Sequence, residues 1–165
     1  MDPLTFAKSY ATLHHIVKKG QMYGVLPYTH HLQAVEGVLR EFGETRTELL
    51  VAAWLHDIVE DTDVKIRDIE ENFGEEVAHL VEGVTSEPAP NRKTKVALTL
   101  PKTREHGVDA ICLKLADRIA NVRSGGASLG MYVKEYPGFR HALYSQGTIN
   151  DRLWEELDRL MGFNK

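Results

Sequence analysis

One stretch of this 165-residue chain shapes the interpretation of the rest: Trp54-Leu55-His56-Asp57-Ile58-Val59-Glu60-Asp61-Thr62. The segment that leads into it, 48–55, is apolar after its first residue, contains no Gly or Pro, and is rich in residues that favour helices. Such a run predicts a buried helix that ends among ionisable side chains. We therefore expect the fold to be arranged around this helix.

Four ionisable side chains stand at the end of that helix: His56, Asp57, Glu60 and Asp61. On a continuous helix His56 lies one turn from Glu60. Asp57 likewise lies one turn from Asp61, so each pair shares a side of the helix. Burying these groups is costly unless something pairs with them, and one nitrogen with three carboxylates suits a divalent cation and a water to be activated. The alternative is a solvated helix end with His56 as a core residue; it fits an isolated His-Asp dipeptide better than it fits this apolar context.

The composition is that of a soluble globular chain, with 42% hydrophobic and 27% charged residues, so one domain over residues 1–165 is the simplest organisation. The net charge of −4 argues against a general nucleic-acid binder. Cys112 is the only cysteine, which excludes an intrachain disulfide framework and a thiolate zinc cluster. No apolar run approaches the ~18 residues of a membrane span, and the N-terminus lacks a signal-peptide pattern, so we expect a cytoplasmic protein.

Helical periodicity recurs along the chain and strand signals are weak everywhere, so the expected fold class is all-α. Thr29 is expected to cap one helix, and the capping-box spacing of residues 45–48 to open the central one. Segments 21–27, 85–91 and 124–130 are expected to be loops. Besides the central helix, we predict helices at residues 3–19, 28–42, 66–73, 77–84, 109–123 and 151–161.

The predicted helix 109–123 carries a second chemical signal. Asp117 interrupts its buried stripe, and Asn121 follows one turn later. A buried carboxylate needs a partner, and a metal ion is a better candidate than a lone salt bridge to Arg118. Upstream, the segment 92–104 is locally basic, which is compatible both with a solvated face and with phosphate binding.

A metal site assembled from three predicted helices is the simplest use of these groups. It combines two imidazoles and two carboxylates, from His31, His56, Asp57 and Asp117. Mixed nitrogen and oxygen ligands without sulfur favour Mn²⁺, Mg²⁺ or Fe²⁺ over structural zinc. His31 taken alone, at the head of an apolar stripe, would more often be a core histidine.

This set resembles the signature of the HD-domain phosphohydrolases, which is a His, a His-Asp pair and a distal Asp. Over roughly residues 5–123 the surrounding sequence is similar to the hydrolase domain of RelA/SpoT proteins. The stretches that carry the likeness are Pro27-Tyr28-Thr29-His30-His31, His56-Asp57-Ile58-Val59-Glu60-Asp61-Thr62, Phe73-Gly74 with Val84-Thr85, and Leu113-Lys114-Leu115-Ala116-Asp117-Arg118 with Asn121. The resemblance implies an HD-domain helical bundle and, because no synthetase or regulatory region follows, a stand-alone small alarmone hydrolase.

The resemblance also implies roles for single residues. One divalent ion, Mn²⁺ before Mg²⁺ or Fe²⁺, would be held by His31, His56, Asp57 and Asp117. The family pattern of Pro-Tyr-two residues-His selects His31 rather than His30. Glu60 and Asp61 match the pair that positions or deprotonates the attacking water, and Asn121 matches the Asn that contacts the nucleotide.

The substrate-binding residues are the point where this chain departs from the family. The family commonly carries an Arg-Lys pair shortly after the Gly-Gln that corresponds to residues 20–21, and that Arg packs against guanine. This chain has Tyr23 there and is about one residue shorter; an aromatic ring can stack on any base. The cationic candidates for the phosphates are Lys114, Arg118, Arg92 and Lys93.

Three functions are compatible with this sequence. The first is metal-dependent hydrolysis of the 3′-pyrophosphate of (p)ppGpp to GDP or GTP and pyrophosphate. The second keeps the metal site but takes another nucleotide, such as NADPH, a deoxynucleoside triphosphate or a nucleoside phosphate. The third is a non-catalytic nucleotide-binding module, against which Glu60, Asp61 and Asn121 argue. We expect a small nucleotide as the partner, with no nucleic acid and no membrane, and the sequence leaves a homo-oligomer open.

Overall fold

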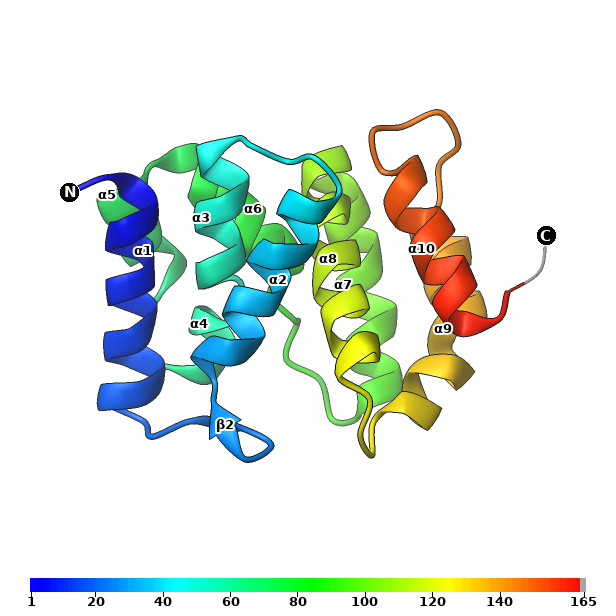
Figure 1. The fold of residues 1–165 in the computed structure, drawn as a ribbon, viewed down its shortest axis with the longest axis horizontal. Coiled ribbons are helices and arrows are strands. Elements are labelled where there is room, and N and C mark those ends of the chain that lie inside the picture. The colour runs from blue at the N-terminus through cyan, green and yellow to red at the C-terminus, as the bar shows by residue number, and fades with distance from the viewer. Residues whose placement is uncertain (164–165) are drawn as a thin grey trace.

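The apolar run forms the central helix α3 (Thr47–Leu55), in which every residue from 49 to 55 is buried. The structure is a computed structural model that describes residues 1–163. Helix α3 packs against its neighbours on several sides, as Figure 1 shows. These neighbours are α1 (Pro3–Ala11), α2 (Thr29–Glu41), α6 (Glu75–Val84) and α8 (Val108–Ser124).

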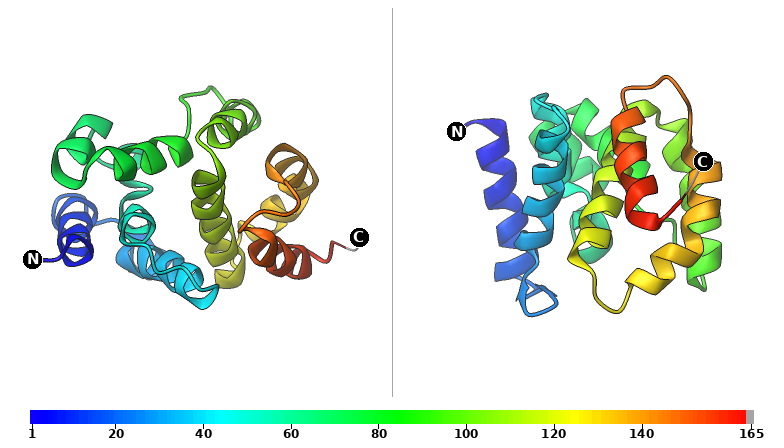
Figure 2. Two further views of the ribbon diagram at one scale, coloured as in Figure 1. Left: turned by 90° about the horizontal axis from the view of Figure 1, so that it is seen from above. Right: turned by 45° about the vertical axis from the view of Figure 1, so that its right-hand side comes forward.

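Helix α8 links the two halves of the molecule. Viewed from above, it lies between the N-terminal helices and the C-terminal pair, α9 (Leu129–Leu143) and α10 (Asp151–Met161) (Figure 2). The remaining elements are the π-helix η1 (Thr12–Val17), strands β1 (Met22–Tyr23) and β2 (Leu26–Pro27), and helices α4 (Ile58–Asp61), α5 (Ile66–Phe73) and α7 (Arg92–Glu105).

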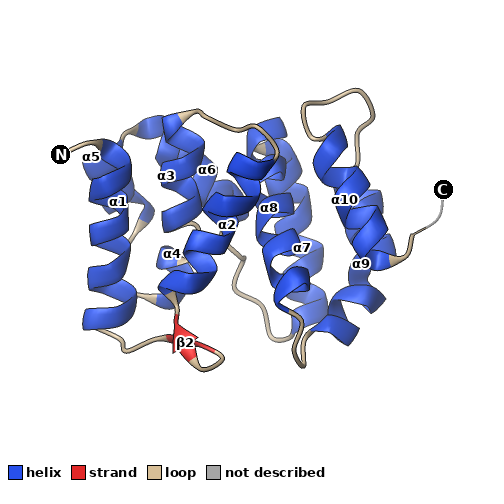
Figure 3. Cartoon of the chain, viewed as in Figure 1, coloured by secondary structure: helices blue, strands red, loops and turns tan. Residues whose placement is uncertain are grey.

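The predicted all-α, single-domain fold is confirmed for the described residues, apart from one small hairpin. Strands β1 and β2 pair antiparallel within the predicted loop 21–27 (Figure 3). The predicted domain span of 1–165 includes residues 164–165, which lie outside the described part. Among the described residues, every helix is too short or too polar to cross a membrane.

Two predicted helix starts are wrong in detail. Helix α2 begins at Thr29 itself, and its N-cap, Tyr28, makes no side-chain capping bond. Helix α3 has Arg46 as its N-cap, so the predicted capping box does not form. Instead the Glu44 carboxylate accepts the backbone N–H groups of Thr45 and Arg46, at 2.9 and 2.7 Å. A carboxylate just ahead of a helix satisfies free amides as a capping hydroxyl would.

Helix α9 was not predicted, because Pro137 and two glycines interrupt its pattern. Proline and glycine both lower helix propensity, so local sequence argues against a helix here. Three side chains on α9 are buried all the same: Tyr136, Phe139 and Leu143. Tertiary burial of these large groups outweighs the local cost.

Gly83 on α6 lies tightly against the end of α7 and the start of α8. A Cβ built there would lie 2.7 Å from His106 Cβ and 3.0 Å from Ala110 Cβ. We expect Gly83→Ala to lower the free energy of unfolding by about 1–3 kcal/mol, because the added methyl overpacks this contact. Gly37→Ala is the matched control, since Gly37 is exposed on α2 with no atom within 4 Å of the added Cβ. Urea denaturation of both variants measures the difference. A free energy of unfolding in Gly83→Ala equal to that of wild type would contradict the predicted overpacking.

Candidate functional site

The chain breaks its helix at the His-Asp pair. Helix α3 ends at Leu55 and α4 starts at Ile58, so the predicted continuous helix through Asp61 is wrong. Neighbouring side chains on a regular α-helix point about 100° apart. The break lets both side chains face one point, with His56 Nε2 lying 2.9 Å from Asp57 Oδ2.

Four side chains from separate elements meet at this point. His31 comes from α2, Asp117 from α8, and the His-Asp pair from the α3–α4 break. The two Nε2 atoms of the imidazoles lie 3.3 Å apart. Asp117 Oδ1 lies 3.2 Å from His31 Nε2 and 3.6 Å from His56 Nε2. Asp57 Oδ2 completes the cluster, 3.6 Å from His31 Nε2. His30, the rival for the first position, is exposed.

The surrounding hydrogen bonds orient the ligand atoms of these four side chains toward the centre of the cluster. His56 Nδ1 donates to the carbonyl of Ala53 at 2.8 Å, which leaves Nε2 with its lone pair toward the cluster. The Tyr28 hydroxyl donates to Asp57 Oδ2. Asn121 Nδ2 donates to Asp117 Oδ1 at 2.7 Å. His31, His56 and Asp117 together form a group that could hold a metal ion. A nitrogen and oxygen set with inward lone pairs and no sulfur fits a divalent cation.

Electrostatics within the cluster favour a positive charge at its centre. Burial disfavours a charged imidazole, but the carboxylates of Asp57 and Asp117 outweigh it and hold the pKa of His56 well above 6.5. Burial acts against the Asp57 carboxylate as well, yet the His56 imidazole lowers its pKa to about 2. The pKa of Asp117 also lies well below its usual value, because its hydrogen bonds to His31 and His56 outweigh burial. A divalent cation would offset the negative charge of the two carboxylates as a proton on His56 does, so metal and proton compete for the site.

The cluster opens into a polar cavity of about 260 Å³. Both predicted catalytic carboxylates line it. Glu60 Oε1 accepts the backbone N–H of Ser86 at 2.7 Å, and Asp61 Oδ2 accepts Gln21 Nε2 at 2.7 Å. The cavity therefore holds anchored carboxylates beside the four-residue cluster.

Three of the four predicted cationic side chains line the same cavity: Arg92, Lys114 and Arg118. Lys93 does not; it is exposed on α7, one position past Arg92. The buried guanidinium of Arg118 lies 4.6 Å from the ring of Tyr132 and 4.3 Å from that of Phe139. Its Nη1 makes no hydrogen bond within residues 1–163. Its Nη2 lies 3.7 Å from Glu135 Oε2. A planar cation packed on aromatic rings beside the cavity is suited to an anionic ligand.

A second, adjoining cavity of about 470 Å³ is bounded by the hairpin and the 124–128 loop. Asn121 and Tyr132 line both cavities, so the two share a wall. Tyr23, the predicted base-stacking residue, lines this second space. Its hydroxyl donates to Asn121 Oδ1 at 2.8 Å, and its ring stacks on His31 with 4.9 Å between centroids.

Sequence reasoning assigned no role to Tyr28 or Tyr132. Tyr28 stands three residues before His31, so a hydrogen bond toward the cluster was within reach of a pattern argument. Tyr132 lies on the unpredicted helix α9, and no local signal placed it at the cavity.

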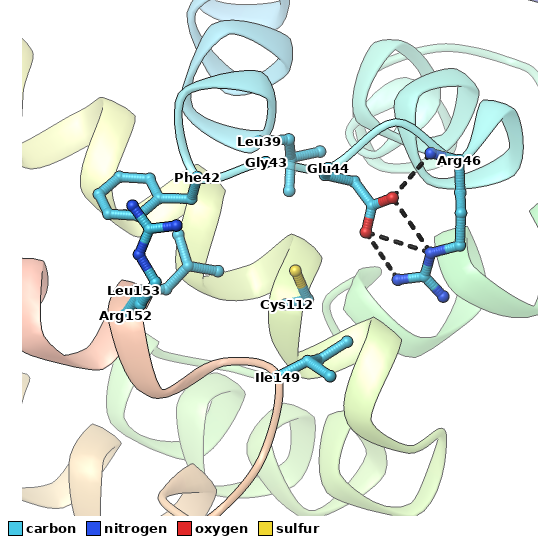
Figure 4. A pocket seen from close by; sticks show the side chains of 9 residues that line it. All are labelled: Leu39, Phe42, Gly43, Glu44, Arg46, Cys112, Ile149, Arg152 and Leu153. Carbon is cyan, nitrogen blue, oxygen red and sulfur yellow. Dashed lines mark hydrogen bonds and ion pairs between the residues drawn. The ribbon is translucent and has the colours of Figure 1, made fainter.

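A third cavity, of about 340 Å³, lies away from this cluster between α2, α8 and α10 (Figure 4). Two of its lining side chains are paired with each other: Arg46 Nη2 donates a hydrogen bond to Glu44 Oε2 at 2.7 Å. Cys112 also lines it, and burial raises the pKa of its thiol to about 12. A thiol that stays protonated is a poor nucleophile, so the Cys112 side chain acts as a packing group at this cavity.

The sequence and the fold of this chain are similar to those of known proteins. The family described as HD domain matches residues 7–129. The guanosine-3′,5′-bis(diphosphate) 3′-pyrophosphohydrolase MESH1 of Drosophila melanogaster is 33% identical over 115 residues, which are 69% of this chain and 64% of that protein. The corresponding pyrophosphohydrolase of Aquifex aeolicus is 42% identical over 106 residues, 59% of this chain and 14% of that protein.

A solved structure of a metazoan ortholog of SpoT that hydrolyzes ppGpp superimposes with a TM-score of 0.82 at 24% identity, covering 99% of this chain and 98% of the other. This likeness shows a shared fold. The chain spans less than two thirds of the length of the curated relatives named above. The matched family and these relatives place the chain in the HD-domain family, as a homologue of the MESH1 and SpoT hydrolase domains.

Proposed function

We propose that this protein is a metal-dependent phosphohydrolase that removes pyrophosphate from the 3′ position of (p)ppGpp, leaving GDP or GTP. One observation carries the proposal: two imidazoles and two carboxylates converge beside a cavity that also presents three cationic side chains. The relatives that are named as ppGpp pyrophosphohydrolases support this choice of substrate.

The metal would be held by His31, His56, Asp57 and Asp117. We propose Mn²⁺, with Mg²⁺ or Fe²⁺ as alternatives, because the ligand set lacks sulfur. A bound divalent cation lowers the pKa of water and draws negative charge from a phosphoryl oxygen.

The attacking water loses its proton to a carboxylate of this chain, Glu60 or Asp61. Each has one oxygen already bound, to Ser86 N and to Gln21 Nε2, so its orientation in the cavity is fixed. A fixed acceptor avoids the cost of reorganising during the reaction.

The cationic side chains Arg92, Lys114 and Arg118 offset charge on the diphosphate. The adjoining cavity then receives the nucleoside, with Asn121 and Tyr23 against it. This division explains why one cavity is charged and the other is lined by the hairpin and a Gly-rich loop.

Pyrophosphate release from ppGpp by metal-stripped protein, with and without added Mn²⁺, tests this proposal. We expect release only with metal. No release, from a protein that still binds Mn²⁺, would reject ppGpp as the substrate.

Tyr23 favours a second candidate, in which the same site hydrolyses another nucleotide such as NADPH or a deoxynucleoside triphosphate. Its ring stands where the family commonly has the guanine-packing Arg, and a stacking ring accepts any base. Turnover of ppGpp, GTP, dNTPs and NADPH under one metal condition separates the two candidates.

We expect Tyr23→Ala to raise the KM for the nucleotide about 10-fold, because base stacking on an aromatic ring is worth ~1–3 kcal/mol. Tyr23→Phe is the matched control; it keeps the ring and removes only the hydroxyl bonds to Asn121 and Ser124. Its KM should stay within about threefold of wild type, since a neutral hydrogen bond contributes ~1 kcal/mol or less. Equal KM values for Tyr23→Ala and wild type would remove Tyr23 from the binding site.

A further inference from the structure

His15 is fully buried, although neither the sequence pattern nor the proposed chemistry uses it. It lies in η1, where Lys18 N donates to Leu13 O in the five-residue step of a π-helix. Its Nε2 has no hydrogen-bond partner within the described chain. Leaving a buried nitrogen unpaired costs stability that an apolar side chain would not cost.

The other ring nitrogen of His15 begins a chain of hydrogen bonds that ends at the cavity. His15 Nδ1 lies 2.7 Å from Gln21 Oε1. The amide nitrogen of the same Gln21 side chain, Nε2, donates to Asp61 Oδ2 at 2.7 Å. The three side chains are separated by 6 and 40 positions in the sequence.

The donors and acceptors in this chain have only one consistent assignment. An ionised carboxylate accepts only, so Gln21 must turn its NH₂ toward Asp61. The carbonyl oxygen of Gln21 then faces His15, so the proton of the neutral imidazole must sit on Nδ1. Burial lowers the pKa of His15, which agrees with a neutral ring.

The backbone holds Gln21 in place between the two ends. Its N–H donates to His15 O at 2.9 Å, and its carbonyl accepts Tyr28 N–H at 3.1 Å. The ring of Tyr28 also packs on that of His15, with centroids 5.0 Å apart. Both backbone groups and both ends of the Gln21 side chain are therefore engaged.

We propose that His15 and Gln21 are positioning residues that hold the Asp61 carboxylate in the orientation in which it accepts the proton of the attacking water. The proposal rests on the proposed function, and it selects Asp61 over Glu60 as the acceptor. It accounts for the buried histidine, whose unpaired Nε2 is tolerated because Nδ1–H fixes the Gln21 amide.

The first test compares turnover of three variants. Gln21→Met keeps the length of the side chain and removes both polar ends, so kcat should fall on the order of 10- to 100-fold with KM unchanged. His15→Leu should show a similar fall. His15→Asn should restore most of kcat, because the Asn amide nitrogen is as many bonds from Cβ as Nδ1 is. Circular dichroism confirms that each variant is folded.

His14→Leu is the matched control, since His14 neighbours His15 in η1 but packs on Tyr10. Its kcat should equal that of wild type. Wild-type kcat in Gln21→Met, or His15→Asn as slow as His15→Leu, would overturn the proposal.

Nitrogen-15 NMR of the His15 ring gives a reading that does not depend on the substrate. The proposed chain of hydrogen bonds requires the Nδ1–H tautomer in wild type and an altered Nδ1 signal in Gln21→Met. An Nε2–H tautomer would overturn the proposed positioning of Asp61 by His15 and Gln21, even if ppGpp is hydrolysed. The required tautomer in a wild type that leaves ppGpp intact would uphold the Gln21 contact and reject only the substrate.

Discussion

His56→Ala and Asp57→Asn are each expected to lower Mn²⁺-dependent release of pyrophosphate on the order of 1,000-fold. In the cluster, each imidazole lies within 3.6 Å of both carboxylates. His56→Ala deletes one of the four ligand side chains, and Asp57→Asn replaces an anionic carboxylate with a neutral amide oxygen, a weaker ligand. Changes to groups that merely support a metal ligand already cost roughly 10- to 100-fold in affinity or activity. Deletion of a ligand, or loss of its negative charge, should cost more, because the remaining set binds the cation less tightly.

Metal content and activity should fall together in these variants. Calorimetric titration with Mn²⁺ measures metal binding, and pyrophosphate release measures activity. His30→Ala is the control, because His30 is exposed and adjoins His31 in the sequence. Wild-type turnover in both His56→Ala and Asp57→Asn would contradict the metal assignment outright.

Arg118→Leu is expected to lower kcat/KM for the phosphorylated substrate about 100-fold. A desolvated, charge-assisted hydrogen bond is worth ~1.5–3 kcal/mol, and the buried Arg118 has a free Nη1 donor. Arg118→Lys should recover little of the loss, because an ammonium group cannot stack between Tyr132 and Phe139 while presenting a planar fork.

The control for Arg118 is Arg67→Leu, which removes one positive charge from an arginine that is 80% exposed on α5. Steady-state kinetics of the three proteins at one salt concentration compares them. A loss in Arg67→Leu equal to that in Arg118→Leu would mean that overall charge, and not the buried guanidinium, sets substrate binding.

Local periodicity was enough to predict several elements of this fold. Residues 49–55 are buried in a helix because they are apolar and free of glycine and proline, and helix 151–161 begins and ends where its pattern does. The same kind of reasoning singled out Asp117, since a carboxylate in a buried stripe needs a partner. These features depend on residues within one or two helical turns, so a linear pattern contains them.

Other features depend on contacts between distant residues. Helix α9 forms in spite of Pro137, because burial of its aromatic side chains outweighs helix propensity. The helix break at His56 and Asp57 turns two sequence neighbours toward one point, which a regular helix would not do.

The sequence by itself determined an all-helical domain and the residues that could hold a cation, because side-chain chemistry and hydrophobic period are local properties. Only the tertiary structure decided which polar groups support them: Arg118 between two rings, and His15 joined through Gln21 to Asp61. Gln21 and Asp61 lie 40 positions apart, and the rings beside Arg118 belong to another helix, so these contacts follow from how the helices pack.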